Sequence, residues 1–294
     1  VSPQGVQTPA SDRKWLAARR SPWAALAGDG RDGWLCALPR LRLRRLLLCH
    51  QGGDVLLDGL HLVAEALAAG VPISHALIGQ RLFRHGTATA LVTGLERAGV
   101  DLFEATDAVA DAASPVRTPT GVVAIAQVRA LALAVALGAR GASPPTPLVA
   151  GVVDVQDPGN VGAIVRAAEA AGATGVVVCG TSADPFGWKA LRGSMGSVFR
   201  VPVAVLPDLD EVILAAKTAG LWVLAASPGG GRTLYDVDLA RPLMVLMGGE
   251  GGGLPDSAMS AADDRIRIPM PPFIDSLNVA VAAGVILFEA HRQR

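Results

Sequence analysis

The sequence has few of the features that mark disulfide-bonded, metal-binding or membrane-spanning proteins. Only three of its 294 residues are cysteines, and none stands in a Cys-x-x-Cys spacing. That pattern indicates neither a zinc site nor a disulfide framework, so we expect no metal. No apolar run reaches the ~18 residues of a membrane span, and the nearest candidate, 129–140, has arginine at both ends. We therefore expect no membrane association.

Strong charge of one sign is also missing, since the formal net charge is zero. The two halves nevertheless differ, because residues 1–146 hold 15 Lys and Arg against 11 Asp and Glu, while the remainder holds 11 against 15. A first half with a net charge of +4 permits, but does not establish, an RNA-facing surface. The first 15 residues carry charge and proline where a signal peptide would be apolar, so we expect a cytoplasmic protein.

The length and the 51% hydrophobic content favour two domains. Residues 1–37 hold three of the five tryptophans without periodicity and predict an N-terminal extension. Residues 38–129 predict a first domain. Residues 130–147 predict a linker, because three prolines fall within its last six positions, where neither a helix nor a sheet interior is favoured. Residues 148–294 predict a second domain.

The first domain shows alternating helical and β-rich patterns. Apolar residues at helical spacing predict a helix over 57–69, ending at Gly70. Further helices are expected over 90–98 and 106–112. The β-rich runs between or after them are 73–78, 100–104 and 121–127. This alternation predicts a small α/β unit.

The second domain contains near-continuous apolar strands, which predict a parallel sheet covered on both faces. The predicted strands are 148–155, 175–179, 201–206, 221–226 and 243–247, and the predicted helices are 161–171 and 208–219. General topology rules would make this an ordinary doubly wound sheet, since knots are almost absent from proteins.

A first chemically suggestive block begins at Val155 and reads VQDPGNVGAIVRAAEAAG. Its Asp-Pro-Gly turn leads to Asn160, a favoured residue for a helix N-cap. On the residues alone, the block is a capped amphipathic helix with Arg166 and Glu169 on its polar side. An exposed pair of that kind contributes a few tenths of a kcal/mol.

A second block, VLMGGEGGGLP from Val245, joins a strand to a glycine-rich loop that carries Glu250. Glycine allows positive φ and close approach of a ligand to the backbone. A dinucleotide fingerprint would need a third glycine where Leu254 stands, so that fingerprint fails. The loop is therefore either a flexible turn or a binding site of another kind.

A third block, IRIPMPPFIDSLNVAVAAG, runs from a short strand through a proline-rich loop into the last helix. On the residues alone, Ser276 would be the N-cap of that helix. Asn278 then falls in the first turn, although asparagine has low helix propensity.

Taken in order and spacing, the three blocks resemble the motifs of the SpoU (TrmH-like) family of SPOUT RNA 2′-O-ribose methyltransferases. The residues that match those motifs are Asn160, Gly162, Arg166, Glu250, Ser276 and Asn278. The resemblance covers the last half of the chain and implies a parallel-sheet SPOUT domain with a trefoil knot. Residues 38–129 are more loosely similar to the family's small RNA-binding domain, which is related to a kink-turn-binding ribosomal protein.

The resemblance also implies a cofactor, S-adenosyl-L-methionine, bound largely through backbone groups at Gly248, Ile268 and Leu277. One residue departs from the family pattern, since Pro272 stands where glycine is often found. Proline has no amide hydrogen, so no amide contact to the cofactor is expected at that position.

The catalytic residues implied by the resemblance are Asn160, Arg166, Glu250, Ser276 and Asn278. Proposals for the family make the motif arginine a general base. A guanidinium group is normally locked in its charged form, so Arg166 is equally suited to bind a neighbouring phosphate and to stabilise a developing alkoxide. The sequence leaves both roles open.

The leading hypothesis is an S-adenosylmethionine-dependent RNA methyltransferase that modifies a ribose 2′-hydroxyl. The extra first domain favours ribosomal RNA over transfer RNA as the substrate. The alternatives are a transfer RNA methyltransferase and a non-catalytic RNA-binding protein on the same fold; the failed fingerprint disfavours an oxidoreductase.

We also expect a homodimer in which the helix 277–289 contacts the partner. That helix is apolar on more than one side, as is typical of a helix that is buried both by its own domain and by a partner subunit. An intramolecular core helix would show the same pattern, and the tendency of the family to dimerise through this region favours the dimer.

Overall fold

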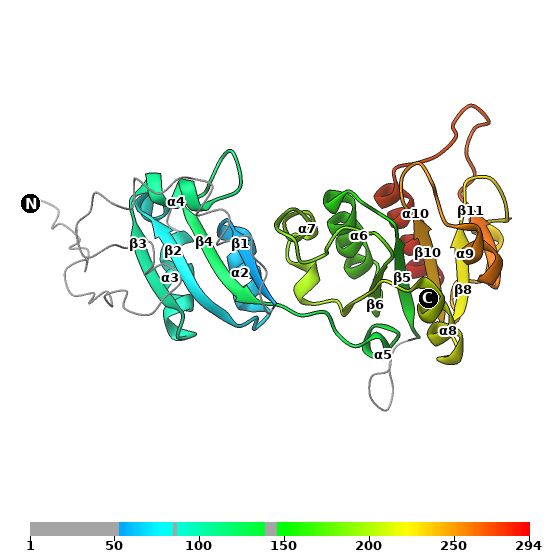
Figure 1. Ribbon diagram of the computed structural model, residues 1–294, viewed down its shortest axis with the longest axis horizontal. Coiled ribbons are helices and arrows are strands. Elements are labelled where there is room, and N and C mark those ends of the chain that lie inside the picture. Colours follow the sequence, from blue (N-terminus) through cyan, green and yellow to red (C-terminus); the bar gives the residue numbers. More distant parts are fainter. Residues whose placement is uncertain (1–52, 85–86, 139–145) are drawn as a thin grey trace, which may run out of the picture.

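The computed structural model describes residues 53–84, 87–138 and 146–294, which fold around two β-sheets (Figure 1). The predicted extension 1–37 and residues 139–145 of the predicted linker lie outside the described residues. We call the described part of 53–127 the N-terminal unit and the described part of 131–294, which includes residues of the predicted linker, the C-terminal unit. No helix of the described residues is long and apolar enough to cross a membrane.

The N-terminal unit is built on a four-stranded sheet in the order β1-β4-β2-β3. β2 and β3 are parallel, whereas β4 runs antiparallel to both of its neighbours. The strands are β1 (Asp54–Asp58), β2 (Ile73–Gly79), β3 (Asp101–Ala105) and β4 (Val122–Gln127). The helices are α2 (Leu60–Ala68), α3 (Thr87–Arg97) and α4 (Asp107–Ala113), with a 3-10 turn at Gln80–Arg84.

Alternating residues of these strands face two different helix layers. Leu57 and Ile78 belong to the core that includes α2 and α3, while Leu56 and Leu77 pack with α4 on the other side. The predicted α/β unit is therefore confirmed. The predicted helix 57–69 begins too early, because Gly59 adopts φ +99° and ends β1 before α2 starts. β1 itself was not predicted.

The C-terminal unit contains a seven-stranded sheet in the order β7-β6-β5-β10-β8-β11-β9, and every neighbouring pair is parallel. The strands are β5 (Leu148–Val153), β6 (Gly175–Cys179), β7 (Val203–Leu206), β8 (Trp222–Ala226), β9 (Arg232–Thr233), β10 (Leu243–Gly248) and β11 (Asp264–Arg267). The parallel sheet is confirmed, and β10 is inserted between β5 and β8. The trefoil knot stays a prediction.

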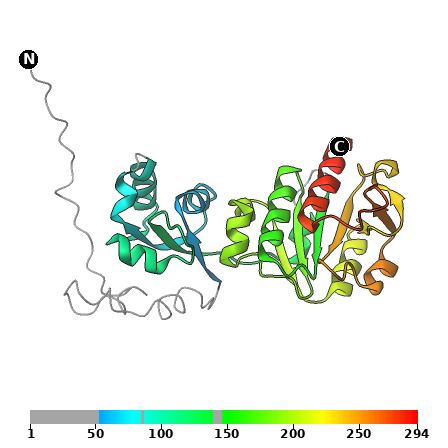
Figure 2. The same cartoon turned by 90° about the horizontal axis from the view of Figure 1, so that it is seen from above.

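Helices cover this sheet on both faces. They are α5 (Leu133–Ala136), α6 (Pro158–Ala170), α7 (Trp188–Ser194), α8 (Leu209–Thr218), α9 (Asp256–Ala261) and α10 (Val279–Gln293), with 3-10 turns at Ser197–Phe199 and Leu234–Asp236. α6 and α10 share one buried cluster, and α8 and α9 belong to the opposite one. Figure 2 shows α10 in red on one side, with α8 and α9 in yellow and orange on the other.

The carboxyl ends of the parallel strands bring the three sequence blocks to one edge of the sheet. The loop after β5 leads into α6, the loop after β10 carries the glycines, and the loop after β11 leads into α10. In open parallel sheets, ligands bind outside these strand ends. This edge is therefore where the functional site is expected.

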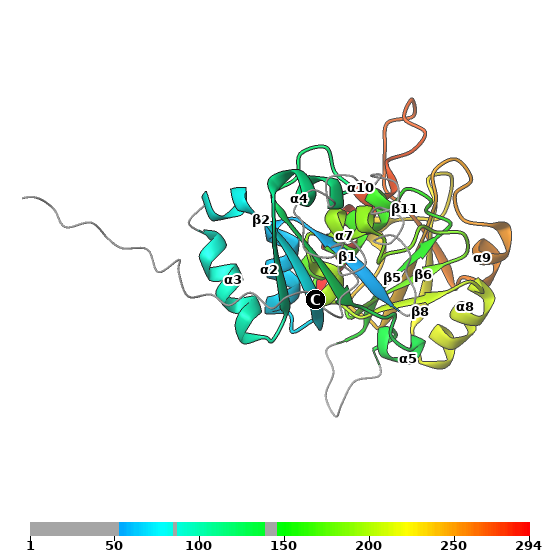
Figure 3. The same ribbon diagram turned by 60° about the vertical axis from the view of Figure 1, so that its left-hand side comes forward.

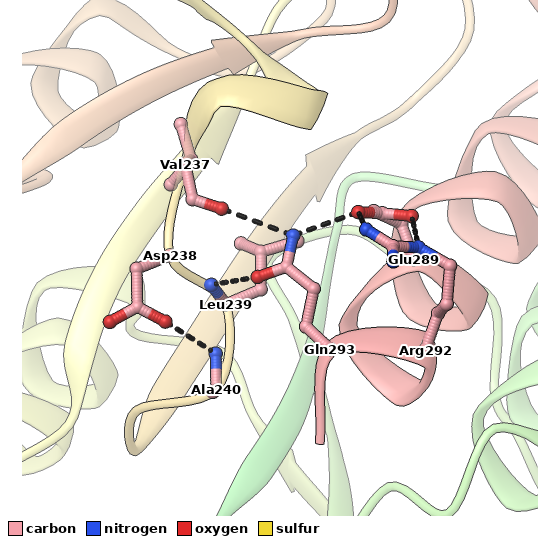
Figure 4. A network of polar contacts seen from close by, with 7 residues as sticks. All are labelled: Val237, Asp238, Leu239, Ala240, Glu289, Arg292 and Gln293. Atoms are coloured by element: carbon pink, nitrogen blue, oxygen red, sulfur yellow. Dashed lines mark hydrogen bonds and ion pairs between the residues drawn. The ribbon is translucent and has the colours of Figure 1, made fainter.

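The last turn of α10 is anchored to the chain that precedes β10 (Figure 4). The Gln293 side chain accepts a hydrogen bond from the Leu239 amide at 2.7 Å and donates to the Val237 carbonyl at 3.2 Å. It also donates to Glu289, which Arg292 holds through two further hydrogen bonds. The C-terminal end of α10 is thus fixed while its N-terminal end reaches the loops of the candidate site.

Candidate active site

One carboxylate joins the three sequence blocks. Glu250 Oε1 accepts hydrogen bonds from Asn160 Nδ2 at 2.8 Å and from Asn278 Nδ2 at 2.9 Å. Asn278 Nδ2 also donates to Asn160 Oδ1 at 3.1 Å. We call these three side chains the amide–carboxylate triad. The triad holds together the loops that follow β5, β10 and β11.

Two helix caps differ from the prediction and explain why these asparagines are free to meet. Asp157 caps α6 by accepting from the Asn160 amide at 2.9 Å, and Pro158 occupies the first turn. Proline suits that position because its missing N–H would be unsatisfied anyway. The predicted cap at Asn160 is therefore wrong, and its side chain points to Glu250 instead.

The cap of α10 is Asn278, and the predicted cap at Ser276 is wrong. Asn278 Oδ1 accepts from the amides of Ala280 at 3.0 Å and Val281 at 3.3 Å. Its Nδ2 is left to donate to the other two triad residues. One side chain thus starts α10 and ties it to the glycine loop.

The glycines of the second block allow the loop to fold tightly on itself. A Cβ at Gly248 would lie 2.2 Å from the carbonyl carbon of Gly253, and one at Gly249 would lie 2.0 Å from the Asp154 oxygen. Positive φ occurs later in the loop, at Gly251 (+91°) and Gly253 (+65°). Gly248 is therefore required for close backbone packing.

A cavity of about 700 Å³ opens between this loop, the end of β8 and the third block. The three predicted cofactor contacts, Gly248, Ile268 and Leu277, all line it, together with Glu250, Ser276 and Asn278. Its walls combine apolar side chains such as Met247 and Ile286 with carboxylates and backbone groups. The volume and this mixed lining are typical of a small-molecule site.

A second cavity of about 620 Å³ lies on the side of the first block. Gly249, Glu250, Gly252 and Gly253 line both cavities, so the glycine loop forms a shared wall. Asn160 and Asp154 line the second cavity only.

Asp154 and Thr181 were not singled out from the sequence. Asp154 Oδ1 accepts from the Thr181 amide at 2.7 Å and from its hydroxyl at 2.9 Å. Asp154 also adopts a positive φ of 54°, which is uncommon outside glycine. Its position directly after a buried strand was the one available signal, because such strand ends face the ligand edge.

Arg166 lies apart from the triad. It follows Asn160 by six residues on α6, which corresponds to about 9 Å along a helix axis. Arg166 is exposed and lines neither cavity, and no hydrogen bond or ion pair of its side chain occurs among the described residues. The Arg166–Glu169 pair of the purely structural alternative does not form, because Glu169 binds Arg200 instead.

Gly162, the glycine of the first motif, serves helix packing. A Cβ there would lie 2.3 Å from the Ala190 carbonyl oxygen and 2.9 Å from the Ser194 amide nitrogen. α6 and α7 approach this closely because no side chain intervenes. The motif glycine therefore positions the helix that carries Asn160 and Arg166.

Neither cysteine nor metal chemistry is suggested near this edge. Burial, with the charge of Asp154 adding to it, raises the pKa of the Cys179 thiol to about 12. The thiol is therefore protonated at neutral pH and is no nucleophile. Among the described residues, no group of three His, Cys, Asp or Glu is placed to hold a metal ion.

Comparison with known proteins identifies relatives of both units. The model of the SpoU rRNA methylase family matches residues 147–288. An uncharacterized tRNA/rRNA methyltransferase of Synechocystis sp. is 34% identical over 257 residues, which is 83% of this chain and 86% of the relative. The 23S rRNA (guanosine-2′-O-)-methyltransferase RlmB of Xanthomonas campestris is 39% identical over 140 residues, 48% of this chain and 56% of the relative.

A solved structure shares the architecture of nearly the whole described chain. The AdoMet-bound rRNA methyltransferase from Sinorhizobium meliloti is similar with a TM-score of 0.74 at 30% identity. The similarity covers 87% of this chain and 95% of that one, and so extends over both sheets.

Proposed function

Because this chain belongs to the SpoU rRNA methylase family, we propose that it transfers a methyl group from S-adenosylmethionine to a ribose 2′-hydroxyl of ribosomal RNA. The observation that carries the proposal is the amide–carboxylate triad, which unites all three sequence blocks beside a cavity of suitable size.

The residues of the larger cavity fit the proposed cofactor. Ile268, Leu277 and Met247 offer apolar contact for an adenosyl group, and Gly248 lines the cavity with backbone atoms alone. The carboxylates of Glu250 and Asp256 also line this cavity and suit a ligand with positive charge. When bound, the cofactor supplies an electrophilic methyl sulfonium.

The second cavity is proposed to receive the nucleotide that is methylated. It borders the same glycine loop as the first, so a ribose bound there would lie next to a cofactor held in the larger cavity. Transfer between two bound molecules depends mainly on their orientation. The triad is proposed to supply this orientation by fixing the loops around both cavities, with Ser276 as a further contact.

Arg166 is proposed to bind the phosphate next to the target ribose. Its side chain is exposed and has no acidic partner among the described residues, so it is available to RNA. A guanidinium group offers hydrogen-bond donors and no acceptor, which favours a phosphate anchor over a general base. A bidentate contact to phosphate is the strongest use of such a group.

The N-terminal unit is proposed to bind the RNA that contains the target. This agrees with the relatives named for 23S ribosomal RNA and with a similarity to an rRNA methyltransferase that spans both sheets. The substrate class implies a cytoplasmic location. No metal is proposed to take part.

A homodimer through α10 is also proposed. Val281 and Phe288, seven residues apart and so on the same side of that helix, are 54% and 49% exposed, which leaves apolar surface for a partner subunit to cover. α10 packs against α6, so the helix that carries Arg166 lies beside the proposed interface. Light scattering on the whole chain should give twice the chain mass; a monomer at micromolar concentration would contradict the proposal.

The enzymatic proposal is tested with S-adenosylmethionine carrying a labelled methyl group and a 23S ribosomal RNA transcript. Alkaline hydrolysis cleaves RNA through the free 2′-oxygen, so a 2′-O-methylated site should yield a labelled dinucleotide. A labelled mononucleotide would indicate base methylation and contradict the proposal. If label appeared only in transfer RNA, the substrate would be transfer RNA and the proposal of ribosomal RNA would be wrong.

A further inference from the structure

An ion-pair cluster joins the N-terminal unit to the helix that carries Arg166. Arg200, which follows the 3-10 turn Ser197–Phe199, donates from Nε and Nη2 to the two carboxylate oxygens of Glu169 on α6. Its Nη1 donates to Glu65 Oε2 on α2 of the N-terminal unit. A single guanidinium group is therefore shared between carboxylates of both units.

The chain around Arg200 is shaped to receive Glu65. Gly196 adopts φ +87°, and a Cβ there would lie 2.6 Å from the Glu65 Cβ. The aliphatic part of Glu65 therefore packs directly on the turn that follows α7. Because any side chain at position 196 would displace Glu65, the close contact depends on this glycine.

A longer-range electrostatic attraction, without a direct hydrogen bond or ion pair, crosses the same junction. Asp58, at the end of β1, is only 8% exposed, and Ser114 donates to it at 2.7 Å. Burial raises the pKa of Asp58, while Ser114 and the positive charge of Arg192 on α7 act in the opposite direction. Figures 1 and 3 show α7 beside β1, in agreement with the contacts between these elements.

We propose that Arg200 is a positioning residue, which holds the N-terminal unit in one orientation on α6 so that RNA bound there reaches Arg166. The inference rests on the proposed function. Glu169 stands three residues after Arg166 on α6, and residues at that spacing are neighbours on a helix surface. The docking contact and the phosphate anchor therefore share one helix.

The contribution of this cluster lies in orientation more than in folding stability. Arg200, Glu65 and Glu169 are 40%, 30% and 29% exposed at their side chains. Partly exposed ion pairs stabilise a fold weakly. Fixing two binding units relative to each other, however, raises the effective concentration of the second site for a ligand held by the first. Long RNA should benefit from the cluster, and short RNA should not.

The test compares Glu65→Lys with Glu104→Lys in the whole chain. Both variants change the net charge equally. Glu104, however, is exposed on β3, which is the edge strand of the N-terminal sheet at the other end from β1. With 23S ribosomal RNA, Glu65→Lys should raise the KM about tenfold over Glu104→Lys, as expected for a lost effective concentration. The kcat and the S-adenosylmethionine affinity, which report an intact C-terminal unit, should match between the two.

Two further measurements separate docking from general damage. The isolated stem-loop that carries the methylated ribose should be used equally well by both variants. In an Arg200→Met background, Glu65→Lys should have no additional effect, because the charge that repels it is gone. Small-angle X-ray scattering should show a larger maximum dimension for Glu65→Lys than for Glu104→Lys.

Equal KM values with 23S ribosomal RNA and equal dimensions for the two lysine variants would overturn the proposal. So would an equal loss of activity of Glu65→Lys on the stem-loop. The scattering comparison needs no activity. A chain that methylates no RNA would therefore contradict the proposed function, while the dimensions of the variants still decide on docking.

Discussion

Asn278 offers the sharpest separation of structural from functional roles, because its two ends do different things. Its Oδ1 caps α10, and its Nδ2 donates to Glu250 and Asn160. Serine is as good a helix cap as asparagine, but it is too short to reach the other two side chains. Asn278→Ser therefore removes the two hydrogen bonds that Asn278 donates within the triad and keeps the cap, whereas Asn278→Ala removes those bonds and the cap.

The expected magnitudes follow from these contacts. A hydrogen bond contributes about 1 kcal/mol net of the bonds to water that it replaces. Losing the two that Asn278 donates should therefore destabilise the loop arrangement by about 2 kcal/mol, which corresponds to a roughly thirtyfold lower transfer rate. Losing the cap costs a further ~1 kcal/mol of stability. For a protein of this size that corresponds to about 2–4 °C in melting temperature.

Single-turnover methyl transfer and thermal unfolding should be measured on both variants. We expect both to lose transfer rate to a similar extent, and only Asn278→Ala to show the additional loss of melting temperature. Transfer by Asn278→Ser at the wild-type rate would refute the reasoning, because the triad would then have no part in catalysis.

Three further predictions concern other parts of the site and its support. Arg166→Ala should lower single-turnover transfer more than tenfold and leave calorimetric S-adenosylmethionine binding intact, and Arg166→Lys should also be poor because lysine lacks the bidentate fork; activity near wild type in either would contradict the phosphate role. Gly248→Ala should lower both the melting temperature and cofactor affinity, whereas Gly252→Ala, whose Cβ would meet nothing within 4 Å, should melt like wild type. Arg292 and Gln293 lower the pKa of Glu289 from 4.5 to about 2, so its stabilising contribution is present above pH 4.5 and is lost as the pH falls to about 2. Denaturant unfolding should therefore show Glu289→Gln less stable than wild type at pH 5 and equal to it near pH 2, and a constant difference would be evidence against this assignment.

The strands of the C-terminal unit could be predicted because each is an almost unbroken run of apolar residues, whereas an element at the surface carries polar residues on its exposed side. β6, at Gly175–Cys179, matches the predicted bounds, and β5 and β10 differ by one or two residues. β1 was missed because its apolar residues continue into α2, and only the backbone of Gly59 separates the two elements.

The candidate site was predictable as a set of residues but not as a set of contacts. Asn160, Glu250 and Asn278 were found from their three blocks, and the parallel sheet brings the blocks together. The caps move from Asn160 to Asp157 and from Ser276 to Asn278. These shifts of three and two residues in the helix starts are not resolved by periodicity.

Contacts between distant parts of the chain were outside the reach of the sequence. On the residues alone, the Arg166–Glu169 pair was expected because helix neighbours are the partners that a sequence reveals. Glu169 instead binds Arg200, 31 residues away, and Arg200 binds Glu65, at a separation of 135 residues. Such ion pairs form only when helices and turns from distant parts of the chain pack against each other, and the spacing of residues within one helix does not reveal this packing.

We expect this chain to methylate a ribose in ribosomal RNA through the triad around Glu250, with Arg166 as the contact to the neighbouring phosphate. The most direct test maps 2′-O-methylated riboses across all RNA of source cells with and without the gene. A copy that encodes Arg166→Ala should be included in the deletion strain. We expect one ribosomal RNA position to lose its methyl group in the deletion strain, to regain it with the wild-type copy and to stay unmodified with Arg166→Ala. An unchanged map in the deletion strain, or full restoration by Arg166→Ala, would contradict this expectation.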